Sequence, residues 1–291
     1  MKRGCVFLTV KINNLTKFIF VFALVTAAFI IQLTSLSKDY DKEFTELPVI
    51  MYHQVTSRAS RIGKYCVGLQ QLEDDLKYIK AHGYETITVG DLLDYVNANK
   101  SIPKKPIMIT FDDGFESVNE YVTKLMEKYD MKCIVSVVGA YADMTEEQND
   151  HNVNYAYLDW QEIAQLVINE HIEIQNHSYD LHNNTSARKG ASQCVGEDFD
   201  SYRKMLDSDL TKLQNRIKAV SGYAPTAFTY PFGSYSKDST DVIKQLGFKA
   251  AFVCEEVVNK IDTTNTNWMY KIGRFNRSGQ TSTERFFAKL E

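Results

Sequence analysis

The hydrophobic pattern of this 291-residue chain changes repeatedly between short apolar runs and longer segments with helical spacing. In the segment 69–79 the apolar side chains recur every three or four residues, and a glycine at position 83 ends the pattern, as expected for an amphipathic helix. The run 106–109 is short, partly β-branched and bounded by proline, which is typical of a buried strand. The alternation of the two patterns predicts a parallel α/β sheet or barrel.

The pattern assigns an element to most of the second half of the chain as well as the first. We predict strands at residues 47–53, 85–89, 106–109, 132–138, 172–175, 227–230, 249–254 and 268–272. We predict helices at residues 69–79, 91–99, 116–128, 159–169, 199–220 and 236–246, the fourth of them with an N-cap aspartate. The polar segments 139–157 and 183–196 are predicted to be loops.

Residues 18–37 form an unbroken run of 20 uncharged residues, about the length of helix that crosses a bilayer. Basic residues precede the run and acidic residues follow it, so the positive-inside rule places the N-terminus in the cytoplasm and the domain outside. We expect either a single-pass membrane anchor, which the apolar length favours, or a signal segment whose cleavage secretes the protein. The chain then consists of a basic tail (1–17), this segment (18–37), a charged tether (38–46) and one catalytic-sized domain (47–291).

Charge and cysteine content exclude several classes of protein. The net charge is −4, and from residue 38 onward 29 basic residues face 37 acidic ones, so no basic footprint for nucleic acid is present. The five cysteines show no Cys-x-x-Cys spacing, which argues against a zinc ribbon or a redox pair. The domain is long enough to bury a core without disulfide bonds.

Two adjacent carboxylates, Asp112 and Asp113, follow the predicted strand 106–109 and precede Gly114. In barrels and open α/β sheets, catalytic groups gather at this end of the strands. Successive side chains of an extended segment point apart, so one carboxylate can bind a metal ion while the other stays free as a base. The alternative is an ordinary turn in which Asp113 caps the following helix.

Two histidines, His177 and His182, follow the predicted strand 172–175. Their spacing of five does not place them on one face of a helix, but in a loop at a strand end they can converge. With Asp113 they supply one oxygen and two nitrogens, which suits zinc or a related divalent ion and leaves positions for water and substrate. Taken singly, either histidine is equally compatible with an exposed loop.

A third stretch, Tyr230-Pro231-Phe232-Gly233, follows the predicted strand 227–230. Its proline and glycine fix the backbone, and the amide N–H of Phe232 is a candidate donor to a developing oxyanion. Taken alone, the stretch is an ordinary Pro-x-Gly turn.

In this order the three stretches resemble the motifs of the NodB-type polysaccharide deacetylases, carbohydrate esterase family 4, over residues 47–272. The resemblance implies Asp112 as the general base and a metal site made of Asp113, His177 and His182. It implies an irregular (β/α)7 barrel of the polysaccharide deacetylase type, with which the alternation of elements is compatible. The implied cofactor is a divalent cation, Zn²⁺ first, with Co²⁺ or Ni²⁺ as alternatives.

The departures from the common family pattern are informative. Many members space the metal histidines four apart and carry an arginine in the third motif, whereas here the spacing is five and no arginine precedes Pro231. These features and an early Met-Tyr-His are similar to the poly-N-acetylglucosamine deacetylase branch. The family's C-terminal Leu-x-x-His is missing after residue 254, so we assign the general acid to His53, which ends a predicted strand. Four further residues are candidates for orienting the catalytic groups: Asn176, Tyr179, Asp180 and Arg274.

The resemblance implies hydrolysis of N-acetyl groups on an extracellular polysaccharide that contains N-acetylglucosamine, such as poly-N-acetylglucosamine, a chitin-like polymer or the peptidoglycan glycan. One alternative is hydrolysis of O-acetyl esters on a xylan-type polymer. An alternative of another class is a non-catalytic glycan-binding module on the same barrel, which the missing C-terminal histidine motivates. The expected partners are the acetylated glycan and, through the N-terminal helix, the membrane.

Overall fold

The computed structural model describes residues 13, 19, 21–28, 44–97 and 99–290. The chain divides into two compact units, Met1–Phe44 and Thr45–Glu291. The predicted membrane or signal segment 18–37 and the tether 38–46 lie mostly outside the described residues, although residue 19 and residues 21–28 are helical. No helix within the described ranges is long and apolar enough to cross a membrane.

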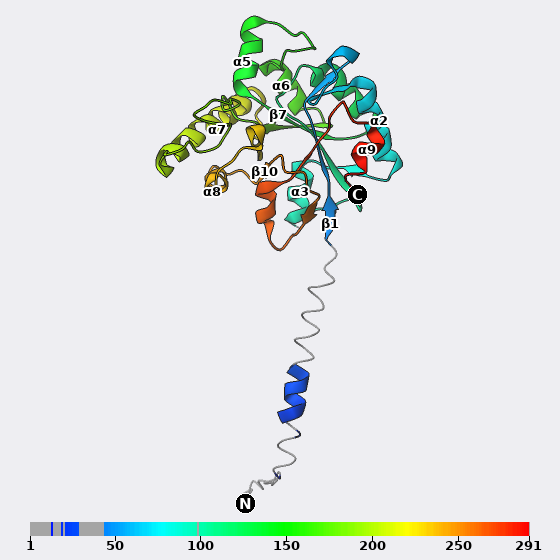
Figure 1. Cartoon of the computed structure of the whole chain (residues 1–291), viewed down its shortest axis with the longest axis vertical. Coiled ribbons are helices and arrows are strands. Elements are labelled where there is room, and N and C mark those ends of the chain that lie inside the picture. The colour runs from blue at the N-terminus through cyan, green and yellow to red at the C-terminus, as the bar shows by residue number, and fades with distance from the viewer. Residues whose placement is uncertain (1–12, 14–18, 20, 29–43, 98, 291) are drawn as a thin grey trace, which may run out of the picture. The chain divides into compact units, whose positions relative to one another are not determined.

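The second unit is built on a curled parallel sheet (Figure 1). Its strands follow the order β10-β9-β8-β7-β6-β2-β12. Outside this order, β5 pairs with the N-terminal end of β6. Every pairing in this sheet is parallel. The strands are β2 (Val49–Tyr52), β5 (Glu85–Thr86), β6 (Pro106–Phe111), β7 (Cys133–Val137), β8 (Ile172–Asn176), β9 (Ala227–Thr229), β10 (Ala250–Phe252) and β12 (Phe275–Asn276).

The last strand region brings the two ends of this sheet together. Ile272 forms a parallel bridge with Phe252 of β10, at one end of the strand order. Three residues later, β12 pairs in parallel with β2. The segment that ends in β12 therefore contacts both β10 and β2, which fits the predicted (β/α)7 barrel.

The helices lie around the sheet (Figure 1), and most agree with the pattern in the sequence. They are α2 (Leu69–Ala81), α3 (Val89–Val96), α4 (Thr123–Tyr129), α5 (Gly139–Gln148), α6 (Trp160–Val167), α7 (Phe199–Ser221), α8 (Ser239–Gln245) and α9 (Thr283–Phe287). A π-helical turn, η2 (Val118–Val122), leads into α4. The predicted N-cap of α6 is confirmed, because the Asp159 carboxylate accepts a hydrogen bond from the Glu162 amide.

The remaining elements are short. Strand β1 (Thr45–Leu47) pairs antiparallel with β11 (Asn259–Ile261), and β3 (Gln54–Thr56) pairs in parallel with β4 (Cys66–Gly68). Single 3₁₀ turns form at η1 (Ala59–Arg61), η3 (Pro231–Gly233) and η4 (Thr266–Lys271).

Two predicted elements are wrong. The predicted loop 139–157 contains the ten-residue helix α5, whose buried positions are occupied by the small residues Gly139, Ala142 and Thr145. A helix that packs through small side chains shows no apolar periodicity, so the pattern misses it. The predicted strand 268–272 is the turn η4 over most of its length, and the pairing begins only at Ile272.

The alternation of side chains along β6 determines which way Thr110 and Asp112 of the first motif face. Ile107 and Ile109 pack in the cluster that includes residues of α2 and α4, whereas Met108 packs in a second cluster with Val49. Because side chains alternate along a strand, Thr110 lies on the same side as Met108. The same alternation, continued one residue past the end of the strand, points Asp112 toward the barrel interior.

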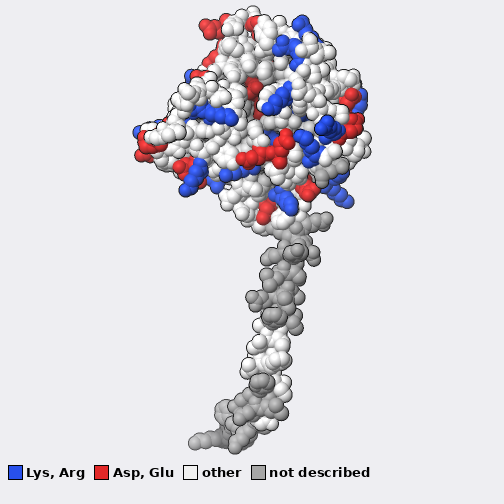
Figure 2. All heavy atoms as spheres, viewed as in Figure 1, with Lys and Arg blue, Asp and Glu red and all other residues white. Residues whose placement is uncertain are grey.

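Charges of both signs are scattered over the face of the domain seen in Figure 2. Figure 2 shows lysine and arginine side chains interspersed with aspartate and glutamate side chains over the face in view. At physiological ionic strength the fields of such interspersed surface charges are largely screened beyond about 8 Å. Recognition of a neutral ligand on this face therefore depends on direct contacts.

A fully buried ion pair ties the end of the chain to α2. Asp75 and Arg277 are 0 % and 1 % exposed, and the Arg277 Nε and Nη2 donate to the Asp75 carboxylate at 2.7 and 3.0 Å. The Tyr52 hydroxyl and the Thr283 hydroxyl donate to the same carboxylate at 2.8 and 2.7 Å. One carboxylate thus joins α2, β2, the segment after β12 and the start of α9.

We expect Asp75→Asn to lower the free energy of unfolding by about 3–5 kcal/mol, because it leaves the Arg277 charge buried without its counter-charge. Urea unfolding followed by circular dichroism measures this value. The matched control is Asp74→Asn, which removes an exposed ion pair with Lys77 and should cost less than about 1 kcal/mol. Equal effects of the two substitutions would contradict the role given to the buried pair.

Candidate active site

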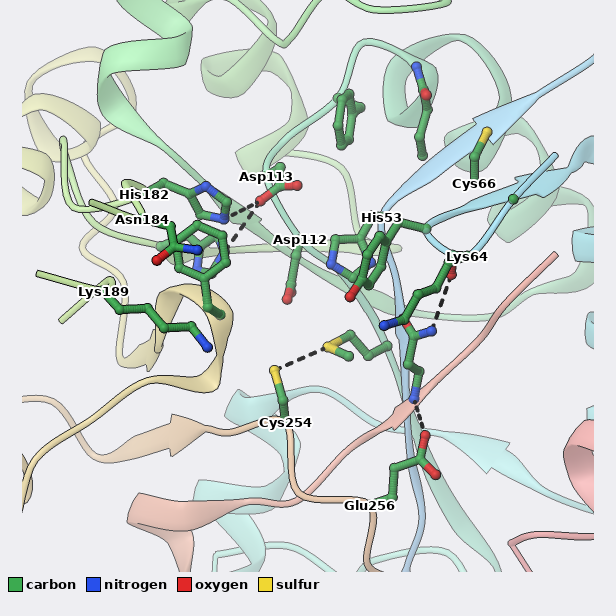
Figure 3. Close-up of a pocket in the computed structure, with 18 residues that line it drawn as sticks. His53, Lys64, Cys66, Asp112, Asp113, His182, Asn184, Lys189, Cys254 and Glu256 are labelled. Carbon is green, nitrogen blue, oxygen red and sulfur yellow. Dashed lines mark hydrogen bonds and ion pairs between the residues drawn. The ribbon is translucent and has the colours of Figure 1, made fainter. Parts of the chain in front are cut away.

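A cavity of about 800 Å³ opens beyond the C-terminal ends of β2, β6 and β8. Side chains from four separate stretches of the chain supply its candidate catalytic and metal-binding groups, as the close-up in Figure 3 illustrates in part. All six residues that the sequence singles out as catalytic or metal-binding line this cavity: His53, Asp112, Asp113, His177, His182 and Phe232. The structure therefore brings residues of all three stretches together at one cavity.

Asp113 and the two histidines converge on one point. The Asp113 Oδ1 atom lies 3.4 Å from His177 Nε2 and 3.1 Å from His182 Nε2. Ligands bound tetrahedrally at zinc distances are about 3.4 Å apart, which agrees with both separations. Figure 3 shows both imidazole contacts directed at the same carboxylate oxygen.

Each imidazole is held through its Nδ1 atom, which leaves its Nε2 atom near Asp113. His177 Nδ1 lies 2.7 Å from the carbonyl oxygen of Thr229, so Nδ1 carries the proton and Nε2 is left with a free lone pair. His182 Nδ1 lies 3.2 Å from the Tyr141 hydroxyl. The Asp113 Oδ1 atom is buried and accepts no hydrogen bond, which is costly unless a cation fills the place of the donor. These residues fit a divalent metal ion.

The ionisation of Asp113 also favours a cation. Burial raises the pKa of this carboxyl, but the nearness of His177 and His182 outweighs burial and holds its pKa well below the usual range. Asp113 therefore presents a carboxylate at neutral pH.

Asp112 takes a different partner, as the alternation along the strand predicts. Its two oxygens accept hydrogen bonds of 2.7 and 2.8 Å from the Nη1 and Nη2 atoms of Arg274. Arg274 is completely buried and also donates from Nε to the carbonyl oxygen of Val253 and from Nη1 to the Thr110 hydroxyl. Burial raises the pKa of Asp112, but Arg274 outweighs it and lowers the pKa, so the carboxyl stays ionised.

His53 and Phe232 complete the cavity wall. The Nδ1 atom of His53 is buried without a hydrogen-bond partner, and burial lowers the pKa of this imidazole, although the charges of Asp112 and Asp113 work against that effect. Phe232 has a left-handed backbone with φ of 59°. The centroid of its ring lies 4.4 Å from the centroid of the His182 ring.

Backbone strain is concentrated at this cavity. Asp113, Ser178 and Phe232, one in or beside each motif, all have positive φ, at 71°, 76° and 59°. Each such residue other than glycine costs on the order of 1–3 kcal/mol, and such residues cluster at functional sites. The strained positions therefore mark the same site as the side chains do.

The residues that orient these groups were only partly foreseen. Of the four candidates, Arg274 contacts Asp112 directly, and the Asn176 side chain accepts a hydrogen bond from the Ser178 amide within the histidine loop. The amides of Tyr179 and Asp180 both bind the Asp209 carboxylate, which fixes the loop from α7. Tyr141 was missed because it lies on α5, the helix that the pattern assigned to a loop.

Comparison with known proteins agrees with this geometry. A profile described as polysaccharide deacetylase matches residues 99–251. The chain is 26% identical over 219 residues to a poly-beta-1,6-N-acetyl-D-glucosamine N-deacetylase of Staphylococcus aureus, an alignment that covers 74% of this chain and 69% of that protein. An Escherichia coli protein of the same name is 20% identical over 224 residues, which cover 71% of this chain and 33% of that protein.

Solved structures share the fold. A de-N-acetylase from Aggregatibacter actinomycetemcomitans matches with a TM-score of 0.73 and 18% identity, over 84% of this chain and 99% of that one. IcaB from Ammonifex degensii matches with a TM-score of 0.69 and 21% identity, over 84% of this chain and 97% of that one. Since the family profile covers more than half of the chain, this protein belongs to the polysaccharide deacetylase family and is a hydrolase.

Proposed function

We propose that this protein removes N-acetyl groups from an extracellular polysaccharide that contains N-acetylglucosamine, with a divalent cation held by Asp113, His177 and His182. The observation that carries the proposal is the convergence of these three side chains beside a second, separately oriented carboxylate. The relatives named for deacetylation of poly-beta-1,6-N-acetyl-D-glucosamine support the choice of substrate class.

The three proposed ligands would hold a metal ion in a partly closed site. One carboxylate oxygen and two imidazole nitrogens leave coordination positions for water and substrate, as in catalytic zinc sites. A bound cation would supply Lewis-acid polarisation of the acetyl carbonyl and acidify the attacking water. Zn²⁺ is the first choice for this ligand set, with Co²⁺ or Ni²⁺ as alternatives.

Asp112 is the proposed general base. Each carboxylate oxygen has two lone pairs, so the fork of Arg274 leaves a further lone pair on each oxygen for the proton of the attacking water. The pair with Arg274 fixes the rotation of the Asp112 carboxylate, so less entropy is lost when the reacting groups reach a productive geometry. Because its pKa is lowered, Asp112 is ionised at neutral pH and ready to accept a proton.

His53 is the proposed general acid. An amide nitrogen leaves as an amine only if it receives a proton, and His53, whose buried Nδ1 has no hydrogen-bond partner, lines the same cavity as Asp112. The amide N–H of Phe232 is proposed to donate to the oxyanion, because the turn of Phe232 lies against His182 at the cavity wall. The products are acetate and a glucosamine unit with a free amine.

The cavity offers suitable surfaces for a sugar chain. Tyr65 and Phe232 line it with aromatic rings that are 51% and 39% exposed, and Lys64, Asn184 and Lys189 add hydrogen-bond donors. Ligand sites typically combine an apolar wall with a few polar groups in this way. The volume of about 800 Å³ lies within the range of known ligand cavities, about 300–1,000 Å³.

The proposed location is the outside of the cell membrane, with the segment 18–37 as a membrane anchor, or the exterior if that segment is cleaved. The support comes from the sequence: 20 uncharged residues with basic residues before them and acidic residues after them. A polysaccharide substrate outside the cell agrees with this direction of export. The alternative of a non-catalytic glycan-binding module is disfavoured, because the chain belongs to a family of hydrolases.

Asp112→Asn is expected to lower the rate of acetate release from an N-acetylglucosamine oligomer by about 10²–10⁴-fold, since the amide cannot accept the proton. The substitution leaves Arg274 with an uncompensated charge, so activity is normalised to folded protein measured by circular dichroism. The exposed variant Asp74→Asn is the control and should keep its rate. A folded Asp112→Asn enzyme of normal activity would rule out Asp112 as the base.

Removal of metal by a chelator is expected to abolish acetate release, and Zn²⁺ added back should restore it. In Asp113→Ala the rate should stay low after the addition of Zn²⁺, because one of the three ligands is lost. His82→Ala removes an exposed histidine on the outer surface and should respond to chelator and Zn²⁺ as the unaltered protein does. Activity that survives complete removal of metal would end the case for metal-assisted hydrolysis.

His53→Ala separates N-acetyl from O-acetyl hydrolysis. An alkoxide leaves far more easily than an amine anion, so the loss should be about 10²-fold or more on an N-acetyl substrate and much smaller on an O-acetyl ester. The two substrates are compared by acetate release at equal enzyme concentration. Equal losses on both bonds would argue that His53 positions substrate and does not donate the proton.

A further inference from the structure

A second group of metal-ligating side chains lies outside the active-site cavity. It consists of Glu116, His151 and Glu162, whose ligand atoms all lie within 4.8 Å of one another. Glu116 follows the catalytic aspartates by a few residues, Glu162 is in the first turn of α6, and His151 lies in the segment 149–158 between α5 and α6. Among the described residues that line the active-site cavity, none belongs to this group.

The separations within the group match those of ligands around one ion. His151 Nδ1 lies 3.6 Å from Glu116 Oε2 and 3.5 Å from Glu162 Oε1. These distances are long for direct hydrogen bonds but close to the separation of about 3.4 Å between tetrahedral ligands of a bound zinc ion. The proposed active-site ligands Asp113, His177 and His182 show a slightly shorter spacing, at 3.1–3.4 Å.

The burial of Glu116 is the independent sign of a missing ligand. The residue is only 6% exposed, and its Oε2 atom, the one that faces His151, is buried and accepts no hydrogen bond. A buried carboxylate oxygen without a partner is costly, and a cation removes that cost. Glu162 is already oriented for such a role, because Asn119 donates to its Oε1 at 2.9 Å and the Asp159 amide donates to its Oε2.

The electrostatic balance of the group also favours a cation. Burial and the charge of Glu162 raise the pKa of Glu116. Burial lowers the pKa of His151, but the carboxylates of Glu162, Glu116 and Asp159 outweigh burial and raise it. Three carboxylates thus surround one imidazole, an arrangement that stabilises positive charge, whether on the imidazole itself or on a bound cation.

We infer that Glu116, His151 and Glu162 form a second divalent-cation site, separate from the catalytic one. Two carboxylates and one imidazole suit Zn²⁺ or Mn²⁺. The site belongs to the domain itself and does not depend on the function proposed for the cavity.

The position of the group gives the cation a structural effect on the active site. The segment 149–158 runs along the catalytic loop, which is the stretch 112–117 after β6. Phe115 and Tyr157 form an antiparallel bridge. The Glu116 amide donates to the carbonyl oxygen of Ala156, and the Leu158 amide donates to that of Gly114. The Tyr157 ring stacks on the rings of Phe115 and Tyr141. A cation between His151 and Glu116 fastens this segment to the catalytic loop.

The first test counts bound zinc in the full-length chain after removal of metal and dialysis against Zn²⁺. The unaltered protein should hold two ions, and both His151→Ala and Asp113→Ala should hold one. The variant with both substitutions should hold none. His82→Ala, which removes an exposed histidine outside both groups, is the control and should hold two.

The Asp113→Ala variant separates this inference from the proposed function. One ion in Asp113→Ala that is lost with His151→Ala supports the second site, whatever the activity of the enzyme. No ion in Asp113→Ala overturns it and means that Glu116 is satisfied by a proton. His151 is partly exposed, so His151→Ala should fold, and circular dichroism without metal checks this.

Hydrogen exchange gives a second measurement in the Asp113→Ala background. At a Zn²⁺ concentration one hundred times the dissociation constant, local opening that releases the ion should become about 100-fold rarer. Amides of residues 149–158 should therefore exchange more slowly with Zn²⁺ present, and the added His151→Ala substitution should remove the effect. Identical exchange with and without Zn²⁺ would overturn the inference.

Discussion

The site depends on the buried pair between Asp112 and Arg274. An uncompensated charge in a protein interior costs several kcal/mol, so neither side chain is tolerable there without the other. Through its remaining donors Arg274 also binds Thr110 on β6 and Val253 just after β10, strands that are not neighbours in the sheet. The pair thus fixes the position of Asp112, the proposed base, and joins opposite parts of the barrel in one interaction. With Asp112 held by arginine, its neighbour Asp113 is left to the histidines.

Much of this arrangement could be predicted from the sequence, because chemistry at strand ends has a local signature. Strand β6 is a compact apolar run, and the aspartates that follow it inherit opposite directions from the period of the strand. The histidine loop follows β8 for the same reason. The resemblance to a family then assigned roles that spacing alone left open. Elements with strong periodicity, such as α2 and α7, were likewise placed correctly.

What the sequence could not supply depends on long-range contacts. Helix α5 packs through glycine, alanine and threonine, so its buried face carries no hydrophobic signal. The partner of Asp112 lies 162 residues away along the chain, and the buried partner of Asp75 lies 202 residues away. His151 lies in a polar segment, and it becomes part of a cluster of ligand side chains only because α6 places Glu162 beside it. Pairings of this kind are set by the closure of the barrel and have no counterpart in local pattern.

The closure of the barrel has a consequence for how the site is completed. The family profile ends at residue 251, yet the arginine that orients Asp112 and the segment that joins β10 to β2 both come later. Asp112 therefore takes its final orientation only when a segment 162 residues further along the chain has joined the barrel. A chain that lacked the residues from 272 onward would keep all three proposed metal ligands but would lack the guanidinium beside Asp112. The site is thus completed by a residue outside the region that the family profile matches.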